Sequence, residues 1–162
     1  MNTDPRVQEL LEFVAIPSVS AQAAHSVDMG RCADWLVEKL RSLGLEARRE
    51  ETAGNPVVVG KTPHDPAKKT VLIYGHYDVQ PPEPLELWTT PAFEPTIRDG
   101  RIFGRGSSDN KGQILAHILG VGEALAEGTL PVNVIFLIEG EEEIGSKHLA
   151  GFLENHRAEL AC

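Results

Sequence analysis

Short hydrophobic runs alternate along the chain with stretches in which hydrophobic residues recur every three or four positions, so strands and helices should alternate too. The helical spacing predicts helices at residues 5–16, about 23–43, about 108–127 and 146–156. Asp4 and Pro5 are typical of the cap and first position of the first helix. The hydrophobic runs predict strands at residues 46–51, 57–60, 71–75 and 132–138. Asp99-Gly100 predicts a hairpin turn between two short strands. This order favours an α/β sandwich around a central sheet.

Composition narrows the classes of partner. The 162 residues fit one domain, and 41% hydrophobic residues are enough for a core. A net charge of -9, with no basic cluster interleaved with aromatic residues, argues against a nucleic-acid partner. The two distant cysteines, Cys32 and Cys162, predict a reducing compartment without a disulfide framework. No secretory pattern occurs at the N-terminus, and no hydrophobic run approaches the roughly 20 residues that a membrane helix needs. We therefore predict a cytoplasmic protein with no membrane partner.

Three polar motifs carry the candidate chemistry, at residues 76–81, 104–112 and 139–145. The first and third directly follow predicted buried strands. Open α/β sheets place ligand sites at such positions, because the strand ends are rigid and the following loops are free to vary. His76, at the start of the first motif, is a candidate metal ligand, and Asp78 is close enough to accept a hydrogen bond from its other ring nitrogen. The alternative for this pair is an ordinary turn with a solvated aspartate.

The other two motifs supply carboxylates. Asp109 lies between glycines at a predicted helix start, where it could cap the helix or bridge two cations. Glu141, Glu142 and Glu143 could form a solvated acidic loop. Alternatively, like charges this close need a compensating cation, and a desolvated glutamate would have a raised pKa suited to a general base. Hydrolysis with a metal ion needs one carboxylate to hold the ion and another to take a proton, so the three motifs together predict a hydrolytic metal site.

Other possible functional residues and motifs have weaker support in the sequence. His117 and His148 lie within predicted helices, where we expect ordinary packing or surface roles. The chain has no Gly-x-Ser-x-Gly turn and no cysteine near a suitable histidine, so nucleophilic catalysis has little support.

Taken together, the three motifs resemble those of the metallopeptidase superfamily of carnosinases, aminoacylases, glutamate carboxypeptidases and desuccinylases, known as metallopeptidase family twenty. Residues 88–93 and 99–102 also resemble the family, and the resemblance extends from the first helix to about residue 160. It implies a zinc-peptidase-like, three-layer α/β sandwich with a central, mostly parallel mixed sheet. The motif at residues 139–146 and Gln80 look most similar to the dipeptidase and carnosinase branch.

The resemblance also implies roles for individual residues. His76 would bind one metal ion, Asp109 would bridge two ions, and Glu143 would bind the second ion. Glu142 would be the general base, and Asp78 would orient His76. The implied cofactors are two divalent ions, most commonly zinc, with manganese or cobalt serving some members. The implied reaction is hydrolysis of the amide bond in a dipeptide or an N-acyl amino acid.

Complete members of that superfamily carry a further aspartate beyond the glutamate pair, a histidine near the C-terminus, and a lid domain for substrate contacts and dimerisation. We therefore expect residues 1–162 to be the N-terminal portion of a catalytic domain, truncated before these parts, and the complete protein to be a homodimer. The Asp109-Asn110 peptide is expected to be cis, as in the family. Two alternatives stay open: a non-catalytic or inactive fragment that acts as an interaction module, and a metal-binding module with a single ion.

Overall fold

The computed structural model describes residues 4–162, and it contains the predicted alternation of helices and strands. The helices are α1 (Pro5–Val14), α2 (Ser26–Ser42), α3 (Lys111–Ala126) and α4 (Leu149–Asn155). The strands are β1 (Glu46–Glu50), β2 (Val57–Lys61), β3 (Thr70–His76), β4 (Thr96–Arg98), β5 (Arg101–Phe103) and β6 (Asn133–Glu139). Single turns of 3-10 helix are η1 (Ala23–His25), η2 (Leu85–Leu87) and η3 (Glu142–Ile144). Every predicted helix and strand is confirmed, although α2 and α3 begin three residues later than expected and α1 and α4 are shorter.

The main sheet has the strand order β1-β2-β6-β3 and is mixed. Strand β3 runs parallel to β6, whereas the β1–β2 and β2–β6 pairs are antiparallel. The expectation of a mostly parallel sheet is therefore wrong for these four strands. The short connection between β1 and β2 forces that pair to run antiparallel, since a parallel pair needs a long crossover. A hydrophobic run identifies a buried strand but carries no information about its direction.

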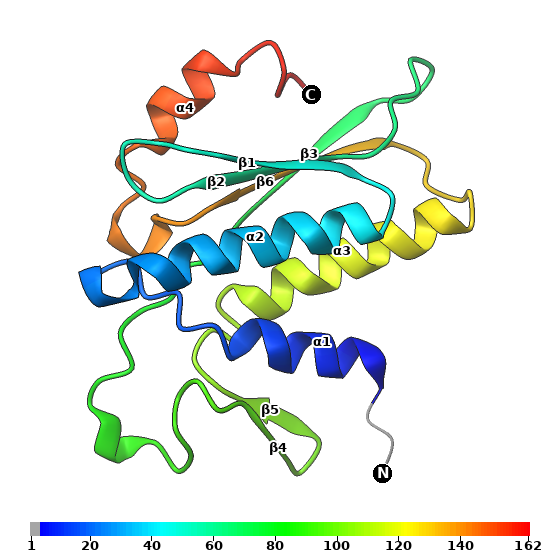
Figure 1. Ribbon diagram of the computed structural model, residues 1–162. Coiled ribbons are helices and arrows are strands. Elements are labelled where there is room, and N and C mark those ends of the chain that lie inside the picture. The colour runs from blue at the N-terminus through cyan, green and yellow to red at the C-terminus, as the bar shows by residue number, and fades with distance from the viewer. Residues whose placement is uncertain (1–3) are drawn as a thin grey trace.

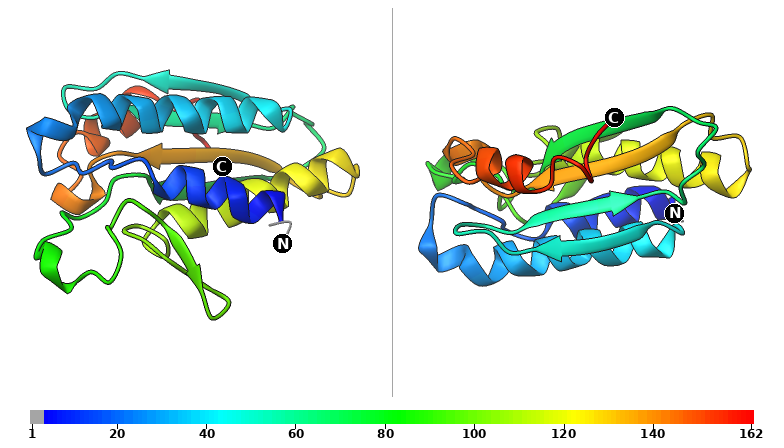
Figure 2. Two further views of the ribbon diagram at one scale, coloured as in Figure 1. Left: turned by 60° about the horizontal axis from the view of Figure 1, so that its bottom comes forward. Right: turned by 90° about the horizontal axis from the view of Figure 1, so that it is seen from above.

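Helices cover both faces of this sheet, which confirms the three-layer α/β class. Helices α2 and α3 lie against one face and α4 against the other (Figures 1 and 2). All seven residues of β6 are buried, because this central strand is enclosed by both outer layers. The larger core cluster lies on the α2 and α3 side, and a smaller one, including Val57, Leu137 and Phe152, lies beneath α4. Packing in the core thus holds the C-terminal end of β6 in place, and the third polar motif begins at this end.

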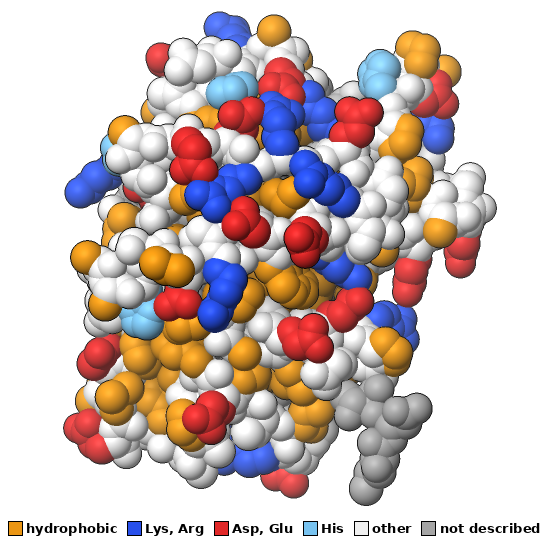
Figure 3. Space-filling model, in the orientation of Figure 1, with side chains coloured by type: hydrophobic (Ala, Val, Ile, Leu, Met, Phe, Trp, Pro, Cys, Tyr) orange, Lys and Arg blue, Asp and Glu red, His pale blue; other side chains and the backbone are white. Residues whose placement is uncertain are grey.

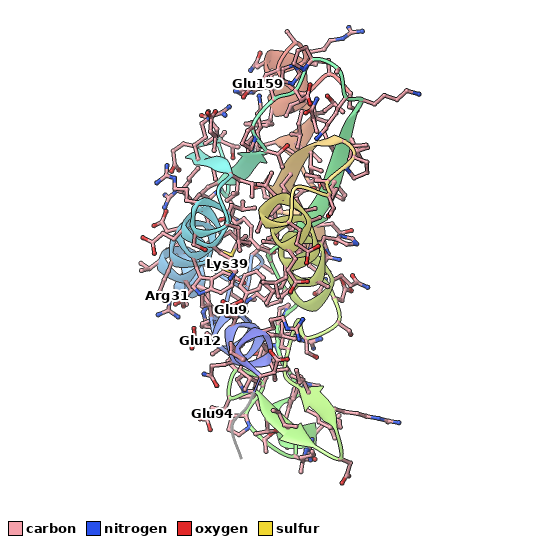
Figure 4. The ribbon with its side chains drawn as sticks, turned by 90° about the vertical axis from the view of Figure 1, so that its right-hand side faces the viewer. Glu9, Glu12, Arg31, Lys39, Glu94 and Glu159 are labelled. Atoms are coloured by element: carbon pink, nitrogen blue, oxygen red, sulfur yellow. The ribbon has the colours of Figure 1, made fainter. Side chains whose placement is uncertain are left out.

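The outer elements are held by local polar contacts. The Asp4 side chain accepts a hydrogen bond from the Arg6 amide at 2.9 Å, which confirms the predicted cap of α1. Lys39 of α2 reaches Glu9 of α1 at 2.7 Å, and Figure 4 shows the two side chains between these helices.

Acidic and basic side chains intermingle on the face drawn in Figure 3. Across residues 4–162, no helix is both long enough and hydrophobic enough to cross a membrane.

The second, small sheet is the hairpin of β4 and β5. Asp99 and Gly100 occupy its turn with positive φ values of 49° and 72°, as the primed hairpin turns require. The predicted Asp-Gly hairpin is therefore confirmed.

Candidate metal centre

The parallel pairing of β3 and β6 brings the first and third polar motifs together. In this register His76 lies beside Glu139, the last residue of β6. The Tyr77 amide donates to the Glu139 carbonyl at 2.9 Å, so the pairing continues just past the end of β3. Both loops therefore leave the sheet at the same edge, as expected for motifs that follow buried strands.

The second motif reaches this edge through the start of α3. The Asn110 side chain accepts a hydrogen bond from the His76 amide at 3.2 Å. The approach requires glycine at position 75, because a Cβ there would lie 2.9 Å from Asn110 Oδ1 and 2.7 Å from Ile114 Cγ1. The Asp109-Asn110 peptide is cis, as the family resemblance implied. The cap position of α3 belongs to Asn110 rather than Asp109, so the helix-cap alternative for Asp109 is wrong.

The two ring nitrogens of His76 face different surroundings. Nδ1 lies 3.1 Å from the Asp78 carbonyl and 3.3 Å from Asp78 Oδ1. Nε2 lies 3.2 Å from Asp109 Oδ1 and 3.8 Å from Glu142 Oε2. Because Nδ1 is engaged on the protein side, Nε2 is the nitrogen directed toward the acidic side chains.

Asp78 is fully buried and joins several parts of the site. Besides facing His76, its carboxylate accepts hydrogen bonds from the Glu142 amide at 3.2 Å and the Glu143 amide at 3.0 Å. It also accepts one from the Ser20 hydroxyl at 2.7 Å. Asp78 thus links the end of β3 to the loop after β6. Ser20 was missed by the sequence analysis, because it lies 58 residues away in the chain and belongs to no motif.

Three potential ligands converge closely. His76, Glu142 and Glu143 offer ligand atoms that all lie within 4.8 Å of one another. Gln80 donates to Glu143 Oε2 at 2.9 Å and to the Glu143 carbonyl at 3.2 Å, which restrains that side chain. Asp109 lies outside this group but contacts His76. All four residues of the predicted metal and base set therefore gather at one edge of the sheet.

The donor set fits a divalent cation. A tetrahedral zinc ion with bonds of about 2.1 Å separates its ligands by about 3.4 Å. The Nε2 distances of 3.2 Å to Asp109 and 3.8 Å to Glu142 are close to that spacing. Within residues 4–162, no lysine or arginine pairs with Asp109, Glu142 or Glu143. The clustered carboxylates thus lack a permanent cationic partner in this part of the chain, which favours a bound cation.

The electrostatics around His76 also reflect the acidic neighbours. Burial lowers the pKa of His76, but the hydrogen bond and charge of Asp78, together with the charge of Glu142, outweigh this effect and raise the pKa to about 9. A cation at Nε2 must therefore displace a proton at neutral pH.

The acidic run after β6 divides into two kinds of residue. Glu141 is buried and accepts hydrogen bonds from His148 Nδ1 at 2.8 Å and from the Asn55 amide at 3.2 Å. The Glu141 side chain therefore has hydrogen-bond partners within the protein, whereas the half-exposed Glu142 side chain has an ion-pair contact with His76 at 3.8 Å. His148 therefore packs against the acidic loop, within the ordinary packing or surface roles expected for it. Sequence spacing could not reveal this pairing, because it depends on how the chain turns after Glu143.

Comparison with known proteins places this site in a family. The sequence pattern of peptidase family M20/M25/M40 matches residues 72–162, more than half of the chain, including all three polar motifs. The chain belongs to this peptidase family. The family assignment confirms the resemblance inferred from the motifs.

Relatives in peptidase family M20/M25/M40 are similar over almost the whole chain. Cys-Gly metallodipeptidase dug1 of Schizosaccharomyces pombe is 36% identical over 98% of this chain and 37% of its own length. The Beta-Ala-His dipeptidase of Homo sapiens is 36% identical over 97% of this chain and 34% of its own length. The chain therefore spans about a third of the length of these curated relatives.

Solved structures agree with the fold. The M20 family metallo-carboxypeptidase of Sulfolobus solfataricus superposes with a TM-score of 0.93 at 38% identity, over 99% of this chain and 36% of that protein. Human carnosine dipeptidase 1 gives a TM-score of 0.88 at 36% identity, over 94% of this chain and 35% of that protein. The mixed α/β architecture is thus that of M20 metallopeptidases.

Proposed function

We propose that residues 1–162 form the N-terminal portion of the catalytic domain of a metal-dependent hydrolase that cleaves the amide bond of dipeptides or N-acyl amino acids. The observation that carries this proposal is the convergence of His76, Glu142 and Glu143, with Asp109 beside them, at the carboxyl ends of β3 and β6. Such a donor set is typical of hydrolytic metal sites.

In this proposal the protein holds two divalent ions. His76 would hold one ion, Glu143 would hold the other, and Asp109 would be shared between them. Zinc is the first choice for imidazole and carboxylate ligands, with manganese or cobalt as alternatives. Bound divalent ions supply Lewis acidity, which polarises an amide carbonyl and lowers the pKa of water.

Glu142 is the proposed general base. Its side chain is 45% exposed and lies 3.8 Å from His76 Nε2, without the buried partners that hold Glu141. A carboxylate in this position can take the proton of an attacking water and deliver it to the leaving amine. Asp78 serves by holding His76 and the Glu142 and Glu143 amides in place.

The proposed substrates are small. The names of the relatives point to dipeptides such as Cys-Gly and Beta-Ala-His, and these are the first compounds to test. The proposed location is a reducing, cytoplasmic compartment. The homodimer and the lid domain stay predictions for the complete protein.

Metal content and activity test the proposal together. Elemental analysis of the complete gene product should find two ions per chain, reduced in Asp109→Ala. Hydrolysis of both dipeptides should be measured in the complete gene product, with Glu142→Gln as the catalytic variant. We expect Glu142→Gln to retain its metal and lose at least about a hundredfold in kcat. Turnover at the wild-type rate would exclude Glu142 as the base.

A second candidate, a metal-binding module with one ion, draws on a specific feature of the site. Among residues 4–162, His76, Glu142 and Glu143 alone form the compact ligand group, and Asp109 lies outside it. One tightly held ion per chain, unaffected by Asp109→Ala, would favour this reading over the dinuclear hydrolase.

A further inference from the structure

Glu139, at the end of β6, is buried although it belongs to none of the proposed metal or base positions. The residue is 2% exposed. Its Oε1 accepts a hydrogen bond from the Tyr74 hydroxyl at 2.6 Å and another from the Ser146 hydroxyl at 2.7 Å. No lysine, arginine or histidine pairs with it within residues 4–162. A buried carboxylate costs free energy unless hydrogen bonds satisfy it, and these two hydroxyls supply such bonds.

The two hydroxyl donors come from opposite sides of the site. Tyr74 lies on β3, two residues before His76, and β3 is an edge strand of the sheet. Ser146 follows η3, the turn that contains Glu142 and Glu143. Glu139 therefore joins the strand that carries His76 to the far end of the loop that carries the glutamate pair.

This loop is held in an unusual backbone conformation at the same point. Gly145 has a φ of 90° and Ser146 has a φ of 49°, although a non-glycine residue rarely adopts positive φ. The Ser146 amide also donates to the Glu141 carbonyl at 2.8 Å. A serine at a position that favours glycine is understandable if its hydroxyl performs a task that glycine cannot.

We propose that Glu139, Tyr74 and Ser146 form a latch that positions Glu142 and Glu143 relative to His76. The latch acts through the loop backbone: when Ser146 is fixed to Glu139, the amides of Glu142 and Glu143 stay on the Asp78 carboxylate. Glu139 is thus a positioning residue rather than a ligand. This inference rests on the proposed function for its catalytic meaning, but its structural core can be tested without metal.

The decisive variant is Ser146→Gly. It removes the hydroxyl from Glu139, yet it keeps the Ser146 amide bond and relieves the positive φ. If the Ser146 hydroxyl had only a structural role, Ser146→Gly would leave the Glu142 and Glu143 amides as well protected from hydrogen exchange as in the wild type. If the latch operates, hydrogen exchange of these two amides in the metal-free chain should accelerate about tenfold, the effect of losing one hydrogen bond. The unfolding temperature should stay near the wild-type value.

The Glu139 variants separate geometry from charge. Glu139→Gln keeps an oxygen that accepts from both hydroxyls and should leave the exchange of the two amides unchanged. Glu139→Leu removes the acceptor and should accelerate it. Equal acceleration in both Glu139 variants, or unchanged exchange in Ser146→Gly, would overturn the latch.

A zinc titration then links the latch to the proposed site. Ser146→Gly should bind zinc about tenfold more weakly than wild type, a loss typical of groups that orient metal ligands. If the complete gene product binds no zinc, the proposed function fails while the exchange result still decides the latch. If zinc affinity is unchanged although exchange accelerates, the latch shapes the loop but does not position the ligands, and the proposal is rejected.

Discussion

The site has a buried half and an exposed half, and the two differ in how their polar groups are satisfied. His76, Asp78 and Glu139 are 8% exposed or less, and each has hydrogen-bond partners within the protein. Asp109 and Glu142 are 76% and 45% exposed, and their only close charged partner in the described chain is His76. The side chains of the buried half are satisfied by contacts within the folded protein, whereas those of the exposed half are available to bind a ligand.

This difference follows from the cost of burial. A carboxylate that leaves water must be satisfied by the protein, so its neighbours are fixed as the chain folds. A carboxylate that stays in water can remain without a partner, and the three such charges near His76, on Asp109, Glu142 and Glu143, attract a cation. Substitutions in the buried half should therefore affect folding, and substitutions in the exposed half should affect binding.

Asp78→Ala should have the largest effect. It leaves the Glu142 and Glu143 amides and the Ser20 hydroxyl without their acceptor. It also removes the carboxylate beside His76, although His76 Nδ1 keeps the Asp78 backbone carbonyl. We expect the free energy of unfolding to fall by about 3 kcal/mol, measured by urea denaturation of the metal-free chain. Asp78→Asn should be milder, because it keeps one acceptor oxygen. If the free energy of unfolding of Asp78→Ala fell by less than about 1 kcal/mol, substitutions in the buried half would not affect folding more than substitutions in the exposed half.

Asp109→Asn should show the opposite behaviour. This exposed residue has little to lose on folding, so its unfolding free energy should stay within about 0.5 kcal/mol of wild type. Zinc affinity, measured by competition with a chromophoric chelator, should fall on the order of a hundredfold. Glu154→Gln, an exposed acid on α4, is the matched control and should leave zinc affinity unchanged. Equal effects of the two variants would mean that general surface charge, rather than the site, attracts the metal.

The pH dependence of stability should report on His76. Its pKa in the folded chain, about 9, is above the ordinary value of 6.5 because of Asp78. Protonated His76 therefore stabilises the metal-free protein fully below pH 6.5, and this contribution is lost as pH rises through 9. We expect a loss on the order of 2 kcal/mol in the unfolding free energy, measured with a chelator present. A His76→Gln variant should not show this decline.

The smallest effect is expected at Glu159, an acid that has permanent cationic partners. It lies 2.7 Å from Lys61 and 2.8 Å from Arg48, and the Lys61 hydrogen bond, with help from Arg48, holds its pKa below the ordinary value. Ionised Glu159 stabilises the folded protein fully above about pH 4.5, and this contribution is lost as pH falls through the lowered pKa. Glu159→Gln should cost about 0.5 kcal/mol at pH 7 in urea denaturation, and less at pH 3. Zinc affinity should not change, since this acid already has its cations.

Much of this protein could be predicted from local sequence. The helix spacing gave α1 through α4, and Asp99-Gly100 gave the β4–β5 hairpin, because these features depend on neighbouring residues. The candidate ligands were also recognisable, since each motif follows a hydrophobic run or lies among glycines. Strand direction was not predictable, and the antiparallel pairing of β2 with β6 corrected the expectation.

The sequence by itself determined which residues are polar at the ends of buried strands, and therefore which could carry chemistry. Only the tertiary structure decided that Glu139 and Glu141 turn inward, that Glu142 and Asp109 stay exposed, and that Ser20 reaches Asp78. The physical reason is that identical carboxylates differ only in their surroundings. Those surroundings are set by contacts between segments that are far apart in the chain, which local patterns cannot encode.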